Sequence, residues 1–543
     1  MTLAPGRPAG PAGEKLRVSR ALWVSAATMA SRLLGLVRDQ LFAALVGANR
    51  FSDAFVVAFR IPNLLRDLFA EGALSAAFVP TFAEAHRHRG SEQAYRLGNA
   101  VVAVLLLAVG AATVAGVLWA GPLVRVVAPG LAEAELAAAL TRVMMPFLLL
   151  VSLSAAAMGM LNAQSRFAAP ALAPALFNVG AIAVGAGLWI AGWPPERAVA
   201  GWAVGTLLGG ALQLGVQLPA LHRLGYRFRP RLSRAALRDR GLRRVFGLMG
   251  AAVVGLSATQ VNIVVNTFFA SRVVGANTWL QCAFRLMQLP LGVFAVAVAT
   301  VAGAGVAQRA ADRDMAAVRA TVGAALRLVA FLNVPSAVGL VVLARPIISL
   351  VYQHGRFGAA DTEATARALL WYAAGLYAYS GVKVLAPAFY ALGAARVPAL
   401  ASWASMLANV ALNALLFPLL GFEGVALGTA LAATVNLGVL LLAWRRAHGG
   451  LAGSAAPHQL GRVLLASAAL AVAAWAAHRG LALALPSGRG AGRQLLLALG
   501  PIAMGGAVYL WAARALGIGE LADLVRAFRG GRHRSSGPHR GCG

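Results

Sequence analysis

Several charged residues interrupt the apolar N-terminal part of the sequence. They are Arg32, Arg38, Asp39, Asp53, Arg60, Arg66, Asp67 and Glu71. If this segment crosses a membrane, a single arginine or aspartate at the bilayer centre costs about 2.5–3.5 kcal/mol on insertion scales. A group of such charges must therefore line a water-filled cavity, form ion pairs or extend to the membrane interface.

Arginine is the residue type best suited to hold a phosphate group. Its planar guanidinium donates two parallel hydrogen bonds to adjacent oxygen atoms and keeps its charge when partly buried. Arg285 lies in the apolar sequence LQCAFRLMQLP and has no acidic neighbour there, so it needs an anion from elsewhere. Several converging arginines would form a site for a large anionic headgroup. Lys383 either adds a point charge to that site or extends to the interface.

The carboxylates in the same region have two interpretations. Asp53 and Arg60 are seven residues apart, which is two helical turns, and therefore share a helix face. They could belong to the anion site. Alternatively Asp53, Arg60 and Asp67 form internal ion pairs that only rigidify a helical bundle.

The composition indicates that these residues belong to a polytopic membrane protein. The chain has 543 residues, of which 59% are hydrophobic and 12% are charged, and its mean hydropathy is +0.73. Soluble domains contain about 45–50% apolar and about 25% charged residues. The long apolar runs exclude a soluble multidomain enzyme, a disordered chain and a β-barrel of short alternating strands. With only Cys282 and Cys542, a disulfide framework and a cysteine-based metal site are also excluded.

The apolar segments predict an all-α fold with about 14 transmembrane helices, since each span needs about 20 apolar residues. Charge-free runs predict helices at 97–124, 143–165, 167–195, 198–221, 245–271, 286–308, 328–344, 397–422, 424–444, 463–477 and 494–513. Three further helices, which contain charges, are predicted at 21–47, 51–84 and 364–393.

The charge distribution predicts how these helices are oriented. Lysine and arginine together number 48 against 18 acidic residues, which gives a formal net charge of +30. A charge of this size could indicate nucleic-acid binding. The basic residues, however, cluster in the loops 86–96, 223–244, 309–319 and 445–462 and in the tail 526–540. These segments share one side if the N-terminus is cytoplasmic, so the positive-inside rule predicts two cytoplasmic termini and argues against a nucleic-acid partner.

An internal repeat divides the chain. FAALVGAN at 42–49 and FASRVVGAN at 269–277 are each followed by an AFR triplet and by a proline 13 residues after the last asparagine. Six predicted helices separate the copies, so both point the same way, as in transporters whose site lies between parallel repeats. Chance similarity in apolar sequence is the alternative. The predicted organisation is a basic cytoplasmic tail (1–20), an N-terminal lobe of helices 1–6 (21–222), a basic cytoplasmic loop (223–244), a C-terminal lobe of helices 7–12 (245–446), helices 13–14 (447–520) and a second basic tail (521–543).

No motif for nucleotide binding or hydrolysis is present in the sequence. Walker A, HExxH, CxxC and GxSxG patterns are all absent. We therefore expect no enzyme activity, no catalytic residues, no metal and no cofactor, and a transport cycle that depends on the membrane potential rather than on ATP. Polar residues of the second half could form a cation site, but hydrogen bonds between helices are the better interpretation because no carboxylate accompanies them. These residues are Asn262, Asn266, Asn409, Asn413 and Thr429.

Six segments of the sequence form a recognisable set of motifs. They are SRLLGLVRDQLFAALVG (31–47), SDAFVVAFRIPNLLRDLFAEGALSAAFVPTFAEA (52–85), VAPGL (127–131), NTFFAS (266–271), FRLMQLPLGVFAVAVAT (284–300) and VKVLAPAFYALGAARVP (382–398). Together they resemble the MurJ (MviN) lipid II flippases of the multidrug/oligosaccharidyl-lipid/polysaccharide exporter superfamily. The resemblance extends from about residue 20 to about residue 520, and its most specific part runs from PNLLR to FAEGALSAAFVP.

This resemblance implies a fold, a function and a set of residues. The fold would be two pseudo-symmetric six-helix lobes plus two C-terminal helices that help to shape a groove for a lipid tail. The function would be alternating-access transport of undecaprenyl-pyrophosphate-linked peptidoglycan precursor (lipid II) from the inner to the outer leaflet of the cell inner membrane. Implied partners are this precursor, membrane lipids and the cell-wall synthesis machinery.

The family's functionally important cavity residues fall on charged positions that the membrane argument also selects. They are Arg32, Arg38, Asp53, Arg66 and Arg285. Asp39, Arg60 and Lys383 are further candidates from the charge pattern alone. Phe284 and Gln288 stand beside Arg285 where some relatives have acids, so the resemblance does not predict a local ion pair there.

Two other functions stay open from the residues. One is another exporter of the same superfamily, for drugs or polysaccharide lipids. A drug–cation antiporter usually needs intramembrane carboxylates, which are not evident in the apolar runs of the second half. The other is a membrane glycosyltransferase acting on polyprenyl phosphates, which would want acidic residues or a metal site in a sizeable loop.

The predicted orientation can be tested by labelling introduced cysteines. In a chain whose two native cysteines are replaced by serine, cysteine at Ser233 should resist a membrane-impermeant thiol reagent added outside the cell. Cysteine at Ser487 should react with that reagent. The basic loop 223–244 would then be cytoplasmic, as the positive-inside rule requires. Labelling at Ser233 and protection at Ser487 would reverse the orientation.

Overall fold

A computed structural model describes residues 11–68, 74–230, 239–451, 456–485, 490–522 and 526. Throughout these ranges the regular secondary structure is helical, which confirms the all-α prediction. Glu71, Ser233 and Ser487 lie outside the described residues, as do the first ten residues and most of the C-terminal tail.

The chain forms two compact units, which are described separately. Unit 1 comprises Met1–Thr278 and His354–Phe357, and unit 2 comprises Trp279–Gln353 and Gly358–Gly543. The helices of unit 1 are α1 (Pro11–Val46), α2 (Arg50–Arg66), α3 (Ser75–Leu118), α4 (Ala120–Val127), α5 (Ala134–Ala163), α6 (Ala168–Ile190), α7 (Pro195–Gly215), α8 (Leu218–Arg223), α10 (Arg240–Ala270) and the first turn of α11 (Ala276–Pro290).

Unit 2 begins inside α11 and contains the helices that follow it. A short π-helical segment (Leu291–Ala295) joins α11 to α12 (Val296–Ala311). The other helices are α13 (Met315–Val342), α14 (Ala344–Tyr352), α15 (Ala359–Ala374), α16 (Leu376–Ala391), α17 (Arg396–Leu420), α18 (Phe422–His448), α19 (Ala456–Ala484) and α20 (Ala491–Ala515).

Within the described ranges, 10 helical segments are long and apolar enough to cross a membrane. The shortest, Ala168–Ile190, has 23 residues. At 1.5 Å per residue it is about 35 Å long, which exceeds the hydrocarbon thickness of about 30 Å. The chain is therefore a multi-pass membrane protein, while the total of about 14 spans and the side of the termini stay predictions.

One of the predicted helices is interrupted in the structure. The helix predicted at 364–393 forms two helices, α15 and α16, which meet at Gly375. Apolar composition alone does not reveal this break. The helix predicted at 51–84 includes α2 and the start of α3, and residues 69–73 between them lie outside the described part of the chain. Helix α3 is kinked at Gly90, inside the segment predicted as the loop 86–96, and the φ of 82° there is one that a residue with a Cβ rarely adopts.

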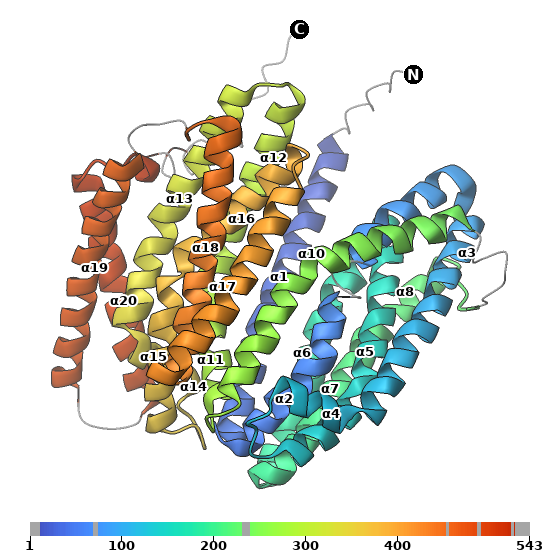
Figure 1. The fold of residues 1–543 in the computed structure, drawn as a ribbon, viewed down its shortest axis with the longest axis horizontal. Coiled ribbons are helices and arrows are strands. Elements are labelled where there is room, and N and C mark those ends of the chain that lie inside the picture. Colours follow the sequence, from blue (N-terminus) through green and yellow to red (C-terminus); the bar gives the residue numbers. More distant parts are fainter. Residues whose placement is uncertain are drawn as a thin grey trace. The chain divides into compact units, whose positions relative to one another are not determined.

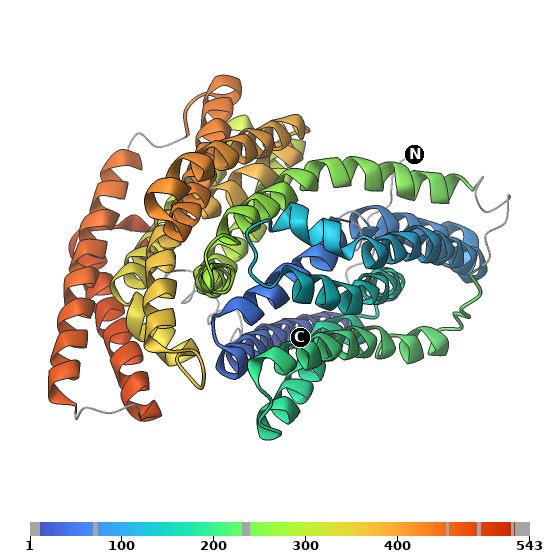
Figure 2. The same ribbon diagram turned by 60° about the horizontal axis from the view of Figure 1, so that its bottom comes forward.

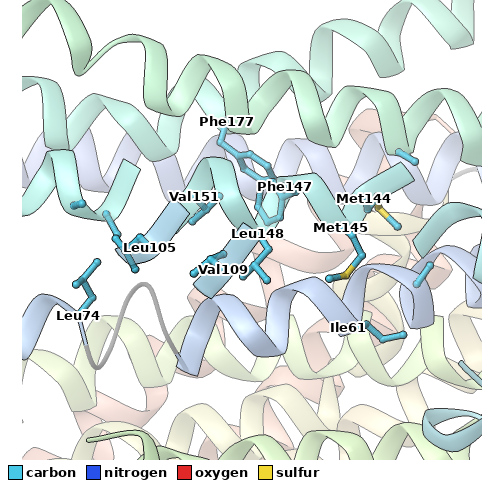
Figure 3. Packing of buried hydrophobic residues seen from close by; sticks show 14 of the residues in the cluster. Ile61, Leu74, Leu105, Val109, Met144, Met145, Phe147, Leu148, Val151 and Phe177 are labelled. Carbon is cyan, nitrogen blue, oxygen red and sulfur yellow. The ribbon is translucent and has the colours of Figure 1, made fainter. Parts of the chain in front are cut away.

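Helix α5 occupies the centre of unit 1. It is apolar on all sides, which is typical of a helix surrounded by others, and it packs against α2, α3, α4 and α7. Figure 3 shows Leu148 and Val151 of this helix close to Val109 and Leu105 of α3, and Phe147 beside Phe177 of α6. Helix α10, which the sequence analysis assigned to the C-terminal lobe, packs along α3 in unit 1 (Figure 2).

A loop that lies far along the chain completes unit 1. The backbone N–H of Arg356 donates to the Ala44 carbonyl at 2.9 Å. Its guanidinium donates to the Leu45 carbonyl at 2.6 Å and to the Trp193 carbonyl at 3.2 Å. Carbonyls in the last turn of a helix lack partners within that helix, so Arg356 satisfies two of them at the end of α1.

In unit 2, the two C-terminal helices α19 and α20 pack beside α13 (Figure 1). The Tyr509 hydroxyl of α20 donates to the Phe331 carbonyl of α13 at 2.6 Å. Arg327 of α13 pairs with Glu520, which follows α20, at 3.2 Å. The C-terminal pair is therefore tied to unit 2 by polar contacts as well as by apolar packing.

Close backbone contact between α6 and α7 depends on glycine. A Cβ at Gly209 of α7 would lie 2.5 Å from the carbonyl oxygen of Phe177 in α6, whereas a Cβ at Gly187 of α6 would meet nothing within 4 Å. Small residues allow membrane helices to approach in this way.

We therefore expect Gly209→Ala to lower the thermal unfolding temperature of the purified protein. Overpacking costs about 1–3 kcal/mol, which outweighs the gain of about 0.8–1.0 kcal/mol from the better helix propensity of alanine. Gly187→Ala is the matched control and should be neutral or stabilising. Equal unfolding temperatures for the two variants would contradict the close contact.

Candidate functional site

The two repeat copies form the same kind of turn in unit 1. In the first copy, Gly47 has a φ of 80° between α1 and α2; in the second, Gly275 has a φ of 87° between α10 and α11. Glycine is favoured at both positions because a Cβ disfavours positive φ. The repeated VGAN sequence thus encodes a repeated turn between helices.

The helices that follow these two turns are capped differently. In the first copy, the Asn49 side chain accepts hydrogen bonds from the backbone N–H groups of Phe51 and Ser52 and so caps α2. The residue before α11 is Gly275, which has no side chain to do this. The N–H groups at the start of α11 therefore need an acceptor from elsewhere.

Asp53 of α2 supplies that acceptor. One of its carboxylate oxygens accepts from the backbone N–H of Gly275 at 2.6 Å, and the other accepts from the N–H of Thr278 at 3.0 Å. The Thr278 hydroxyl lies 2.9 Å from both the Asp53 carboxylate and the Ser52 hydroxyl. A single carboxylate thus performs both hydrogen bonds of a capping box, and the negative charge stabilises the positive end of the α11 dipole.

This arrangement accounts for a costly buried charge. Asp53 is only 2% exposed and Ser52 is fully buried. A buried carboxylate is tolerated when donors satisfy it, and Asp53 has two N–H donors and a hydroxyl. Its observed partners are backbone and hydroxyl groups of unit 1, whereas the sequence analysis considered a cargo or an arginine.

Two other candidate arginines pair with the residue that follows them. Arg38 contacts Asp39 at 2.7 Å, and its guanidinium lies 5.4 Å from the centre of the Phe177 ring. Arg66 contacts Asp67 at 2.9 Å, which agrees with the internal ion pair considered for Asp67. These groups are partly exposed, with side-chain exposures of 15–28%. Partly exposed pairs of this kind contribute little stability, about 0–1 kcal/mol.

The remaining candidates differ in exposure. Arg32 is exposed on α1 and has no hydrogen-bond or ion-pair partner in the described part of the chain. Arg60 is half-buried on α2. Arg285 is half-buried on α11, and Lys383 is exposed on α16. Of the eight candidate residues, Arg285 and Lys383 belong to unit 2. The other six belong to unit 1; they are Arg32, Arg38, Asp39, Asp53, Arg60 and Arg66.

Aromatic packing holds the residue beside Arg285. The ring of Phe284 meets the ring of Tyr372 edge-on, with centroids 5.3 Å apart, and lies 6.3 Å from that of Tyr379. The position next to the arginine is therefore used for packing within unit 2.

The sequence analysis missed Gly275 and Thr278 as partners of Asp53. The repeat itself gave no signal, because both copies read VGAN. The two copies differ in where the helix begins: α2 begins after Asn49, whereas α11 begins at Ala276, before Asn277. Recognising the missing cap would have required knowing that α2 lies beside the start of α11.

Three of the five polar residues considered for a cation site form hydrogen bonds in α17 and α18. The Asn409 amide of α17 donates to the Thr429 hydroxyl of α18 at 3.4 Å, and within α17 the Asn413 amide donates to the Asn409 oxygen at 3.3 Å. The contact between Asn409 and Thr429 supports the interpretation as hydrogen bonding between helices. Among the residues that the structure describes, no group of three or more His, Cys, Asp or Glu side chains could hold a metal ion.

Comparison with known proteins places these residues in a family. Residues 42–484 match the family described as "Lipid II flippase MurJ". A lipid II flippase MurJ of Burkholderia cenocepacia is 37% identical over 433 residues, which cover 78% of this chain and 83% of that protein. A probable lipid II flippase MurJ of Rhizobium meliloti is 33% identical over 525 residues, which cover 94% and 96% of the two chains.

Solved structures agree with these sequence matches. A lipid II flippase MurJ in an inward closed conformation aligns with a TM-score of 0.76 and 25% identity, over 93% of this chain and all of that one. An inward-facing multidrug resistance transporter of the MATE family aligns with a TM-score of 0.64 at 17% identity, over 78% of this chain and 97% of that one, which indicates a shared fold. On the sequence match over residues 42–484, the chain belongs to the MurJ family of lipid II flippases.

Proposed function

We propose that this protein moves lipid II from the inner to the outer leaflet of the cell inner membrane by alternating access. The observation that carries the proposal is the family match over residues 42–484, with relatives named lipid II flippase at up to 37% identity. The chain supplies the helices for a transporter and, at Arg32, an exposed arginine without a partner in the described chain.

The chemistry of the cargo fits the arginines of the candidate site. A pyrophosphate group carries about two negative charges and several acceptor oxygens, and guanidinium groups bind such groups through paired hydrogen bonds. We propose that Arg32, Arg38 and Arg66 of unit 1 and Arg285 of unit 2 bind this headgroup, with Arg60 and Lys383 adding positive charge. Arg38 and Arg66 would then exchange part of their contacts with Asp39 and Asp67 for contacts with the cargo.

Asp53 takes a different part in this proposal. Its carboxylate is occupied by the start of α11, and Arg285 lies seven residues after Thr278 on the same helix. Seven residues are about two helical turns, so the two positions share a face of α11. Asp53 therefore acts as a positioning residue that holds the first turn of the helix carrying Arg285.

The polar residues of unit 2 bear on whether the chain is instead a cation-coupled exporter. Asn409, Asn413 and Thr429 hydrogen-bond to one another, so they offer little support for a coupling-ion site. The precursor and the surrounding lipids are the proposed ligands, the cell-wall synthesis machinery is a proposed partner, and the membrane potential is the proposed driving force.

Replacing Arg285 tests the function and the site together. Cells depleted of the native protein and supplied with Arg285→Ala should accumulate lipid-linked precursor in the inner leaflet, as shown by leaflet-specific labelling. Loss of a charge-assisted contact of about 1.5–3 kcal/mol should slow flipping at least tenfold, with normal protein abundance. Arg285→Lys should restore flipping only in part, because an ammonium cannot donate two parallel hydrogen bonds.

The matched control is Arg446→Ala, which removes an exposed arginine from the last turn of α18 in the same unit. It should flip precursor at the normal rate. Normal flipping by Arg285→Ala would remove Arg285 from the site. Normal distribution of precursor after depletion of the native protein would refute the proposed function itself.

Replacing Asp53 tests its role as a cap. In Asp53→Asn, an amide group would face one of the two backbone N–H donors and leave that donor unsatisfied, at a cost of about 1–3 kcal/mol. We expect a lower thermal unfolding temperature together with slower flipping, whereas Asp312→Asn, at an exposed helix end in unit 2, should change neither. Slow flipping at an unchanged unfolding temperature would instead place the Asp53 carboxylate at the cargo.

A further inference from the structure

A second basic site lies in unit 1, away from the candidate residues discussed above. The first half of α3, the loop 225–230 and the start of α10 enclose a cavity of ≈ 1050 Å³. Six arginines and three acidic residues line it, and six positive minus three negative charges leave a net charge of +3. This volume is large enough for a small organic ligand.

The carboxylates of the cavity are already engaged. Glu84 pairs with Arg244 at 2.8 Å, and Glu92 pairs with Arg96 at 2.7 Å. The third acid, Asp239, accepts the backbone N–H of Leu242 at 3.1 Å and caps α10.

Four arginines of the lining are left without an acidic partner in the described part of the chain. They are Arg89, Arg227, Arg229 and Arg240. All four side chains are exposed, so water and salt screen their mutual repulsion, but together they give the cavity a positive potential that attracts an anion.

Asn99 of α3 fixes the backbone at two of these arginines. Its amide nitrogen donates to the Arg227 carbonyl at 3.0 Å. Its oxygen accepts from the backbone N–H of Arg229 at 2.9 Å and from the Tyr226 hydroxyl at 2.8 Å. Burial raises the pKa of Tyr226, so its hydroxyl stays protonated and continues to donate. The half-buried Asn99 side chain thus holds the loop backbone at both Arg227 and Arg229.

The start of α10 adds a further attraction for an anion. Arg240 and Gly241, the first residues of this 31-residue helix, line the cavity. The N-terminal end of a helix carries a partial positive charge from its aligned peptide groups. The arginines and the helix end therefore both attract an anion, and Asn99 fixes the loop that carries two of these arginines.

We propose that this cavity binds a phosphate compound that carries two or more negative charges. Guanidinium groups match phosphate oxygens through paired hydrogen bonds, and four unpartnered arginines exceed what a single monoanion needs. The ligand is either the headgroup of an anionic membrane lipid or a soluble phosphate compound. The proposal does not depend on the transport function, because none of the proposed cargo-binding residues lines this cavity.

The test uses the full chain in nanodiscs and two phosphate sources. In phosphatidylcholine nanodiscs, inorganic pyrophosphate is titrated and its affinity measured by calorimetry. In nanodiscs that contain phosphatidic acid, retention of this lipid is measured by native mass spectrometry. Binding of pyrophosphate would assign a soluble source, and selective retention of phosphatidic acid would assign a lipid source. Either result supports the site, and absence of both overturns it.

A matched pair of double variants separates the cavity from general positive charge. Arg227→Gln/Arg229→Gln should weaken binding at least tenfold, since each lost charged contact is worth about 1.5–3 kcal/mol. Arg87→Gln/Arg223→Gln removes the same charge from exposed positions on α3 and α8 that do not line the cavity, and should change the affinity less than about twofold. Equal weakening by the two double variants would overturn the proposal.

A further variant keeps every arginine. Asn99→Ala removes three hydrogen bonds from the loop 225–230 without changing the charge. The fixed geometry of the site predicts that it weakens binding by several-fold. Unchanged affinity would show that attraction by charge alone is responsible and would also overturn the proposal.

Discussion

Burying a carboxylate among apolar helices is unfavourable unless donors meet each of its oxygens, and at Asp53 this requirement links separate parts of the sequence. The donors come from the turn between α10 and α11, so α2 and that turn must lie together. This turn depends on Gly275, because its positive φ favours glycine. Glycine has no side chain, so the residue before α11 cannot cap that helix. One buried charge therefore fixes how the two copies of the repeat meet in unit 1.

The charged residues that look alike in the sequence have different surroundings in the structure. Asp53 is enclosed by N–H and hydroxyl groups, Arg38 and Arg66 have adjacent carboxylates, and Arg32 is exposed. A membrane penalises all of them similarly, so hydropathy alone selects the whole set without assigning roles. Their partners distinguish a residue that shapes the protein from a residue that is available to a ligand.

Much of the fold could be predicted because apolar length and clustered arginines are local signals. The helical class and most spans follow from them. The break between α15 and α16 could not be predicted, because glycine is common inside membrane helices. The kink at Gly90, in contrast, lies in the segment 86–96 that its basic residues marked as a loop. For the site, the sequence identified the costly charges, and the resemblance pointed to the same positions. It could not show that Asp53 caps α11, because that contact joins residues more than two hundred positions apart.

The choice of basic residue in this chain affects how it responds to its surroundings. Lysine occurs only at Lys15 and Lys383, and every other basic side chain apart from histidine is an arginine. Guanidinium groups do not lose their proton at any pH that a cell experiences. The positive charge that the arginines contribute along α1, α2 and the arginine-lined cavity is therefore insensitive to acidity. Dissolved salt is what can weaken it, since mobile ions screen exposed charges over about 10 Å at 0.1 M.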